Sequence, residues 1–90
     1  MEHEDDVKSA FFNKTGNQIL SWGGNSIKLW DSSTGEPLVK PMTHIGRVFE
    51  AFFNEEGSKI LSRSGDGTAR LWESITGEQV GESILGISIP

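Results

Sequence analysis

The stretch AFFNKTGNQILS at residues 10–21 returns 41 residues later as AFFNEEGSKILS at residues 51–62. The match extends beyond these stretches, since the first copy carries His3, Val7, Leu29 and Trp30 where the second carries His44, Val48, Leu71 and Trp72. A repeat of this period is typical of a supersecondary unit that buries its apolar faces against copies of itself. Two copies are too few to close or cap such a stack, so we expect the complete object to be larger than this chain.

The composition argues against several classes of function. The net charge of −5 does not suit a nucleic-acid-binding surface, which needs a basic face. Because the chain has no cysteine, it can form neither a disulfide nor a thiolate metal site. This composition is compatible with a reducing compartment, and the expected location is the cytoplasm. No apolar run approaches the roughly 18 residues of a membrane span. The acidic run at residues 2–6 is interpreted as a solvated terminus, with a cation site as the alternative, and neither a cofactor nor a metal is expected.

Each copy is predicted to form four short strands, which makes the fold class all-β. The expected strands lie at residues 7–12, 18–22, 26–30 and 37–42 in the first copy, and at 48–53, 59–64, 68–72 and 79–85 in the second. Asp66-Gly67 is a strong hairpin signal between two of them. Pro37 and Pro41 place the fourth strand at an outer edge, because proline cannot donate to an inner ladder. Apolar residues on both faces of the middle strands indicate sheets covered on both sides by neighbours.

The aromatic residues are predicted to form the core. The expected core positions on the innermost strands are Phe11, Phe12, Phe52 and Phe53. Trp22 has Arg63 as its counterpart and is interpreted as core between the two copies, with a partner-facing aromatic residue as the alternative. Arg63 is expected either to pair with an acid such as Glu50 or to lie exposed on a rim.

The second copy resembles a WD repeat, the four-stranded blade of WD β-propellers. The resemblance rests on the joint spacing of His44, Gly57, Ser62, Asp66, Gly67 and Trp72, and on the Trp30-Asp31 pair of the first copy. It covers nearly the whole chain. It implies one blade at residues 3–43, a second at residues 44–86, and a tail at residues 87–90.

In such blades a histidine, a serine, an aspartate and a tryptophan form a hydrogen-bonded structural tetrad. The resemblance assigns these roles to His44, Ser62, Asp66 and Trp72 in the second copy, and to His3, Ser21, Asn25 and Trp30 in the first. A buried imidazole needs partners for both nitrogens, which a turn carboxylate and a hydroxyl can supply. Asn25 replaces the carboxylate with a weaker acceptor in a turn that is one residue shorter, so we expect a weaker or broken tetrad in the first copy.

The combination of Ser62, His44 and Asp66 also allows a hydrolase interpretation. Ser62 lies inside a predicted strand, without the Gly-x-Ser-x-Gly elbow that exposes a nucleophile. The run Gly65-Asp66-Gly67 is not followed by the helix and the Lys-Ser/Thr pair of a phosphate loop. We therefore predict that the chain is not an enzyme.

The resemblance also sets expectations about assembly and partners. Propellers have four to eight blades, so two blades belong either to a longer chain or to a ring closed by several copies. Cyclic closure by identical chains allows a homotetramer of eight blades or a homotrimer of six. In the family, partners usually bind the face around the central channel, which by position includes Asp6, Lys8, Arg47, Phe49 and Arg63. The expected function is a protein-interaction scaffold, whether the repeat pair is natural, excised or engineered; the alternative is a lectin-like oligomeric propeller that binds small ligands between blades.

Overall fold

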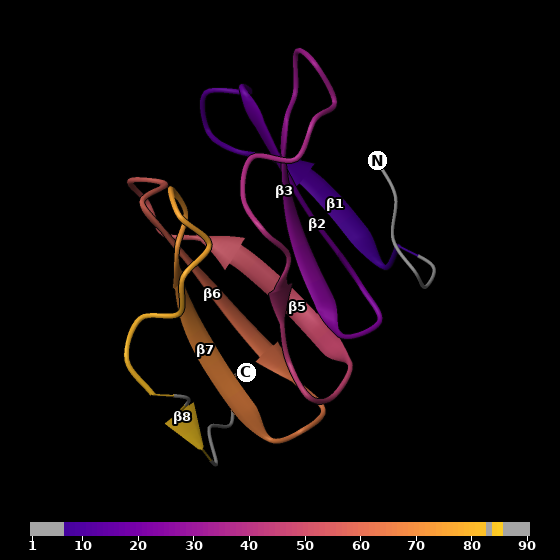
Figure 1. The fold of residues 1–90 in the computed structure, drawn as a ribbon, viewed down its shortest axis with the longest axis vertical. Helices are drawn as coiled ribbons and strands as arrows, with labels where there is room; N and C mark the ends of the chain where they lie inside the picture. Colours follow the sequence, from indigo (N-terminus) through magenta and orange to yellow (C-terminus); the bar gives the residue numbers. More distant parts are fainter. Residues whose placement is uncertain (1–6, 83, 86–90) are drawn as a thin grey trace.

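A computed structural model describes residues 7–82 and 84–85 of the chain. In this part the strands form two antiparallel sheets of four strands each, in the sequential orders β1-β2-β3-β4 and β5-β6-β7-β8 (Figure 1). The strands are β1 (Ser9–Phe12), β2 (Gln18–Gly23), β3 (Ser26–Asp31), β4 (Met42–Thr43), β5 (Val48–Phe53), β6 (Lys59–Ser64), β7 (Thr68–Glu73) and β8 (Ile84–Leu85). The all-β fold class predicted from the repeat is confirmed.

The repeated turn residues explain why the same strands form twice. The side-chain oxygen of Asn13 accepts the N–H of Gln18 at 3.0 Å, and Asn54 does the same for Lys59 at 3.1 Å. Each asparagine therefore closes the turn between the first and second strands of its sheet. Gly24 and Gly67 have φ values of 57° and 85° in the next turns, a region that glycine enters without steric cost.

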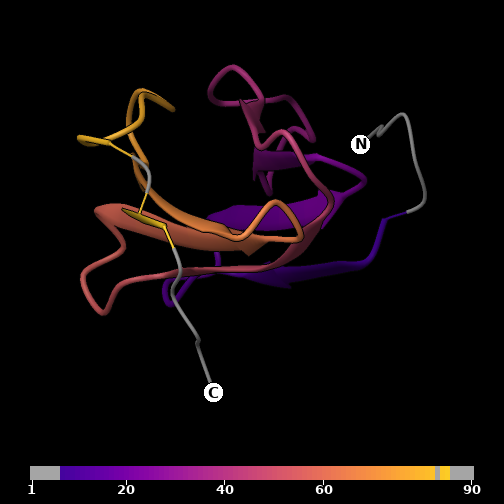
Figure 2. The same cartoon turned by 90° about the horizontal axis from the view of Figure 1, so that it is seen from below.

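The predicted fourth strands are too long. Instead of running through residues 37–42 and 79–85, each consists of a single bridge, a loop and a two-residue strand. The bridges pair Trp30 with Pro37 and Trp72 with Gln79, and the strands are β4 and β8. Proline lacks an N–H, so the segment that contains Pro37 and Pro41 cannot sustain a continuous ladder. Figure 2 shows the loops that follow β3 and β7 rising on the same side of the molecule, which is the outer edge of each sheet.

The hydrophobic core lies between the two sheets. β2 and β3 of the first sheet contact β5 of the second. The buried residues of this core are Leu20, Trp22, Ile27, Leu29, Met42, Val48, Ala51, Ile60 and Trp72. We call this contact the inter-sheet interface. The interpretation of Trp22 as core between the copies is confirmed, because its side chain is buried there and packs edge-on against Phe11 at 5.8 Å between ring centroids.

Main-chain hydrogen bonds also join the two sheets at one end. The N–H of His44 donates to the carbonyl of Asn25 at 2.9 Å, and the N–H of Val48 donates to the carbonyl of Gly24 at 2.8 Å. The chain therefore begins the second sheet while bonded to the β2–β3 turn of the first.

The prediction that all four phenylalanines of the innermost strands are core is wrong for two of them. Phe11 and Phe53 pack against the core, but Phe12 is 63% exposed and Phe52 is 38% exposed. Successive side chains of a strand point to opposite faces, so only one phenylalanine of each pair can enter the inter-sheet interface. The other lies on the outer face of its sheet.

Candidate functional site

The second sheet brings the four side chains expected to form a tetrad into one cluster. His44 precedes β5, Ser62 lies in β6, Asp66 in the β6–β7 turn and Trp72 in β7. The Nε1–H of Trp72 donates to Ser62 Oγ at 2.9 Å, and Ser62 Oγ lies 2.6 Å from His44 Nε2. On the other side of the imidazole, His44 Nδ1 is 3.7 Å from Asp66 Oδ2. This distance is too long for a direct hydrogen bond.

A residue that the sequence analysis did not single out connects the histidine to the aspartate. The hydroxyl of Thr68 lies 3.3 Å from His44 Nδ1 and donates to Asp66 Oδ1. One assignment satisfies every donor: Trp72 donates to Ser62, Ser62 to Nε2 of His44, Nδ1–H of His44 to Thr68, and Thr68 to Asp66. In this assignment the imidazole is neutral and carries its proton on Nδ1.

The electrostatics of the cluster agree with a neutral imidazole beside a charged carboxylate. Burial lowers the pKa of His44 below its usual value, and the positive charge of Arg70 lowers it further, against the opposing effect of Asp66. Burial alone would raise the pKa of Asp66. The hydrogen bonds that Asp66 accepts from Thr68, Gly46 and Ser64 outweigh burial and hold its pKa far below the usual carboxyl value.

The position of Asp66 depends on a close approach between two loops. The N–H groups of Ile45 and Gly46 point to Asp66 Oδ2 at 3.2 and 3.4 Å. A Cβ atom added to Gly46 would lie 2.7 Å from the backbone nitrogen of Asp66, so only glycine fits there. Gly46 is thus a residue of the site that the sequence analysis missed.

The buried cluster does not present a nucleophile. Ser62 is 1% exposed and His44 is 3% exposed, and the Oγ of Ser62 already accepts the indole N–H of Trp72. Within residues 7–82 and 84–85, no group of His, Cys, Asp or Glu is arranged to hold a metal ion. The same part of the chain has no helix long and apolar enough to cross a membrane.

The first sheet shows a corresponding contact and one clear difference. The indole N–H of Trp30 donates to Ser21 Oγ at 2.8 Å, as Trp72 donates to Ser62. Asn25 is exposed and contributes its main-chain carbonyl to His44, whereas Asp66 is partly buried and accepts through its side chain. His3, like Asp6 and the rest of the acidic run at residues 2–6, lies outside the described residues, as does the tail at residues 87–90.

Comparison with known proteins decides the nature of the repeat. No protein-family model matches the chain. The sequence is 33% identical over 81 residues to eukaryotic translation initiation factor 3 subunit I of Debaryomyces hansenii, a WD-repeat protein. The two repeats are WD repeats. The match covers 89% of this chain but only 23% of that relative, so the chain spans about a quarter of the relative's length.

Solved structures support the same conclusion about the fold. The WD blades superpose on the computationally designed Ika8 protein with a TM-score of 0.76 and 25% identity, covering 88% of this chain and 24% of that one. They superpose on the computationally designed Ika4 protein with a TM-score of 0.77 and 25% identity, covering 89% of this chain and 48% of that one. Both neighbours are designed propellers, so the two sheets are propeller blades.

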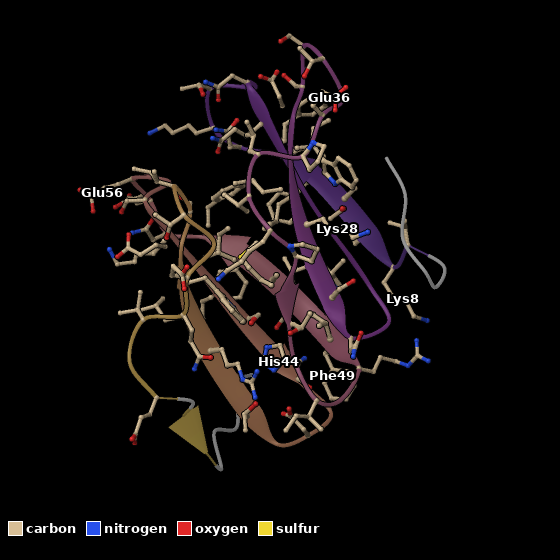
Figure 3. The ribbon with its side chains drawn as sticks, in the orientation of Figure 1. Lys8, Lys28, Glu36, His44, Phe49 and Glu56 are labelled. Carbon is tan, nitrogen blue, oxygen red and sulfur yellow. The ribbon has the colours of Figure 1, made fainter. Side chains whose placement is uncertain are left out.

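Three of the residues expected on a partner-binding face lie together between the WD blades. Lys8, Arg47 and Phe49 line a pocket of about 410 Å³, together with Ser9, Trp22 and Val48. In Figure 3, Lys8 and Phe49 lie toward the lower end of the sheets, while Glu36 and Glu56 lie toward the opposite end. The pocket therefore joins two cationic side chains to two aromatic ones.

Arg63 lies beside this pocket and has a partner of its own. Its Nε donates to Glu50 Oε1 at 2.7 Å, which decides between the two expectations in favour of the ion pair. The guanidinium also lies over the ring of Phe49, 5.3 Å from its centroid. Both charged side chains keep more than a third of their surface exposed, so the pair adds little to stability.

Proposed function

We propose that the chain is a non-catalytic WD-repeat unit that associates with copies of itself into a closed propeller and serves as a protein-interaction scaffold. The observation that carries this proposal is the location of the core between the blades rather than within either one. A blade stabilised through its flat side needs a neighbour on each side. Within residues 7–82 and 84–85, each blade packs against one other blade.

The outer faces of the two blades remain partly open. Exposed or half-buried apolar residues are Ala10, Phe12 and Ile19 on the first blade, and Phe52, Leu61 and Leu71 on the second. Their repeat counterparts include residues of the buried core, such as Ala51, Ile60, Leu20 and Leu29. The two outer faces are thus chemically related to the two faces that already pack within the chain, which favours a head-to-tail contact between copies.

The number of chains in the ring follows from how many blades close a propeller. Cyclic closure by identical two-blade chains gives a homotetramer of eight blades or a homotrimer of six. A longer chain that supplies further blades would satisfy the same faces. In either case the proposed location is the cytoplasm, in keeping with the translation initiation factor among its relatives.

The solution mass of the 90-residue chain tests this proposal. The chain mass is 9.9 kDa, so sedimentation equilibrium is expected to show about 40 kDa for a tetramer or about 30 kDa for a trimer. The fraction of assembled ring should rise with protein concentration. A cooperatively folded 9.9 kDa particle over the whole concentration range would contradict the proposal.

We also propose that the pocket lined by Lys8, Arg47 and Phe49 binds a protein partner through an acidic segment, with Arg63 at its border. Arginine and aromatic residues are enriched at binding hot spots, and the two cations suit carboxylates. In a fluorescence titration with an acidic peptide containing leucine and aspartate, Arg47→Ala should weaken binding at least about ten-fold. Lys14→Ala, which removes a cation at the other end, should leave the affinity unchanged. Equal affinity for a lysine-containing control peptide would contradict the proposal.

A further inference from the structure

Two aromatic contacts stabilise the inter-sheet interface inside the chain. Phe11 of the first blade meets Phe53 of the second edge-on, with ring centroids 6.2 Å apart and an interplanar angle of 85°. Trp22 also packs edge-on against Phe11, at 5.8 Å. The result is an aromatic row, Trp22–Phe11–Phe53, that crosses from one blade to the next.

The sequence repeat places the counterparts of the two phenylalanines of this row on the outer faces, one on each blade. The counterpart of Phe11 is Phe52, on the outer face of the second blade, and the counterpart of Phe53 is Phe12, on the outer face of the first. Both side chains are exposed, Phe52 at 38% and Phe12 at 63%. One chain cannot bring them together, because they lie on opposite sides of the blade pair.

We propose that Phe52 of one copy packs edge-on against Phe12 of the next copy, which repeats the Phe11–Phe53 contact between chains. This inference rests on the proposed self-association and names the residues that make it. The contact is supported by the inter-sheet interface, in which Phe11 and Phe53, the repeat counterparts of Phe52 and Phe12, already pack against each other. The strand register around these residues is also the same in both sheets. Phe11 pairs with Leu20 across strands, and Phe52 pairs with Leu61 in the matching place.

The contact between copies differs from the inner one at two large positions, those of Trp22 and Phe49. Where the inner row begins with buried Trp22, the outer row begins with Arg63, which is paired with Glu50. In the pocket between the two blades, the repeat counterpart of Ser9 is Glu50 and that of Phe49 is Lys8. A pocket of the same kind between copies therefore places the Glu50 carboxylate beside Lys8 of the next copy. The contact between copies is therefore more polar than the inner one. Its strength should fall with salt, because exposed ion pairs are screened.

A charge-exchange experiment tests the aromatic contact in the full chain. Phe12→Glu and Phe52→Lys each place a charge in every head-to-tail contact of their own homo-oligomer. Each variant alone is expected to need at least about thirty-fold more protein for half-assembly than the unmodified chain. In an equimolar mixture the two variants can alternate around a tetramer, so that every contact is either the original phenylalanine pair or the introduced lysine against the introduced glutamate. We expect the mixture to recover the sedimentation mass of the unmodified ring.

Matched variants separate this contact from general effects. Ile75→Glu changes an apolar residue that is 82% exposed and should keep the ring mass, and circular dichroism should show all variants folded. If a variant is unfolded, Phe12→Ser replaces it and should also weaken assembly. Retention of the ring by single variants would overturn the Phe12–Phe52 contact while leaving self-association intact. For an unmodified ring that is a tetramer, folded variants that stay separate when mixed would overturn the contact as well. A monomeric unmodified chain would instead overturn the proposed function.

Discussion

Trp22→Ala is expected to lower the free energy of unfolding by about 3–5 kcal/mol, the range for removing a large buried aromatic side chain. Trp22 is only 7% exposed and fills the space between the blades against Phe11. The truncation leaves a cavity at the contact that holds the two sheets together. Because a domain of this size has little stability to lose, much of the protein should be unfolded at room temperature. Guanidinium denaturation followed by far-ultraviolet circular dichroism measures the effect.

The control for this change is Ile75→Ala, at a site that is 82% exposed, where the expected loss is within about 0.5 kcal/mol. Both proteins must be compared at one concentration, since association contributes to apparent stability. A loss below about 1 kcal/mol for Trp22→Ala would mean that the inter-sheet interface contributes little to folding.

Asp66→Ala is expected to cost about 2–4 kcal/mol, because several donors lose their acceptor at once. Asp66 accepts from the N–H groups of Ile45, Gly46 and Thr68 and from the hydroxyl of Thr68. The matched change Asn25→Ala, at the repeat position in the first blade, should cost less than about 1 kcal/mol because that side chain is exposed. Thermal unfolding of both variants provides the measurement, and equal losses would contradict the difference between the blades.

The same carboxylate gives the protein a predictable response to acid. The pKa of Asp66 is lower in the folded than in the unfolded state, so the unfolded chain binds the proton first as the pH falls. Its stabilising effect is complete above the unfolded value of about 3.9 and is lost as the pH drops below it. His44 acts in the same direction at higher pH, because its pKa is lower in the folded than in the unfolded state. The free energy of unfolding therefore decreases as the pH falls below the unfolded value of about 6.5. Asp66→Ala should remove the lower of these two steps.

Much of the fold could be predicted because the same turn residues occur in both copies of the repeat. Asn13 and Asn54 close equivalent turns, and the middle strands begin and end within one or two residues of the expected positions. The fourth strands could not be placed as well. Pro37 and Pro41 indicated an edge position in the first blade, but residues 79–85 of the second blade contain no proline and its strand is equally short. How far β3 and β7 pair with the segments beyond them is not encoded in a local motif.

The site was predictable to a similar degree. The spacing of His44, Ser62, Asp66 and Trp72 drew attention to residues that the structure places within one cluster. Thr68 gave no signal, because a threonine at the start of a strand is ordinary and its role depends on the orientation of one hydroxyl. Gly46 is needed only where the chain passes the β6–β7 turn, which sequence cannot show. The exposure of Phe12 and Phe52 could have been predicted, because side chains alternate between the two faces along a strand.

The main-chain bonds from His44 and Val48 to the β2–β3 turn have a consequence for assembly geometry. Since backbone atoms alone make them, exchanging surface side chains leaves them in place, and the angular step from one blade to the next is held by the segment between Met42 and Val48. In the proposed ring this connection occurs at every second contact between blades, because neighbouring copies are not joined covalently. The covalent and non-covalent contacts must therefore alternate around the axis.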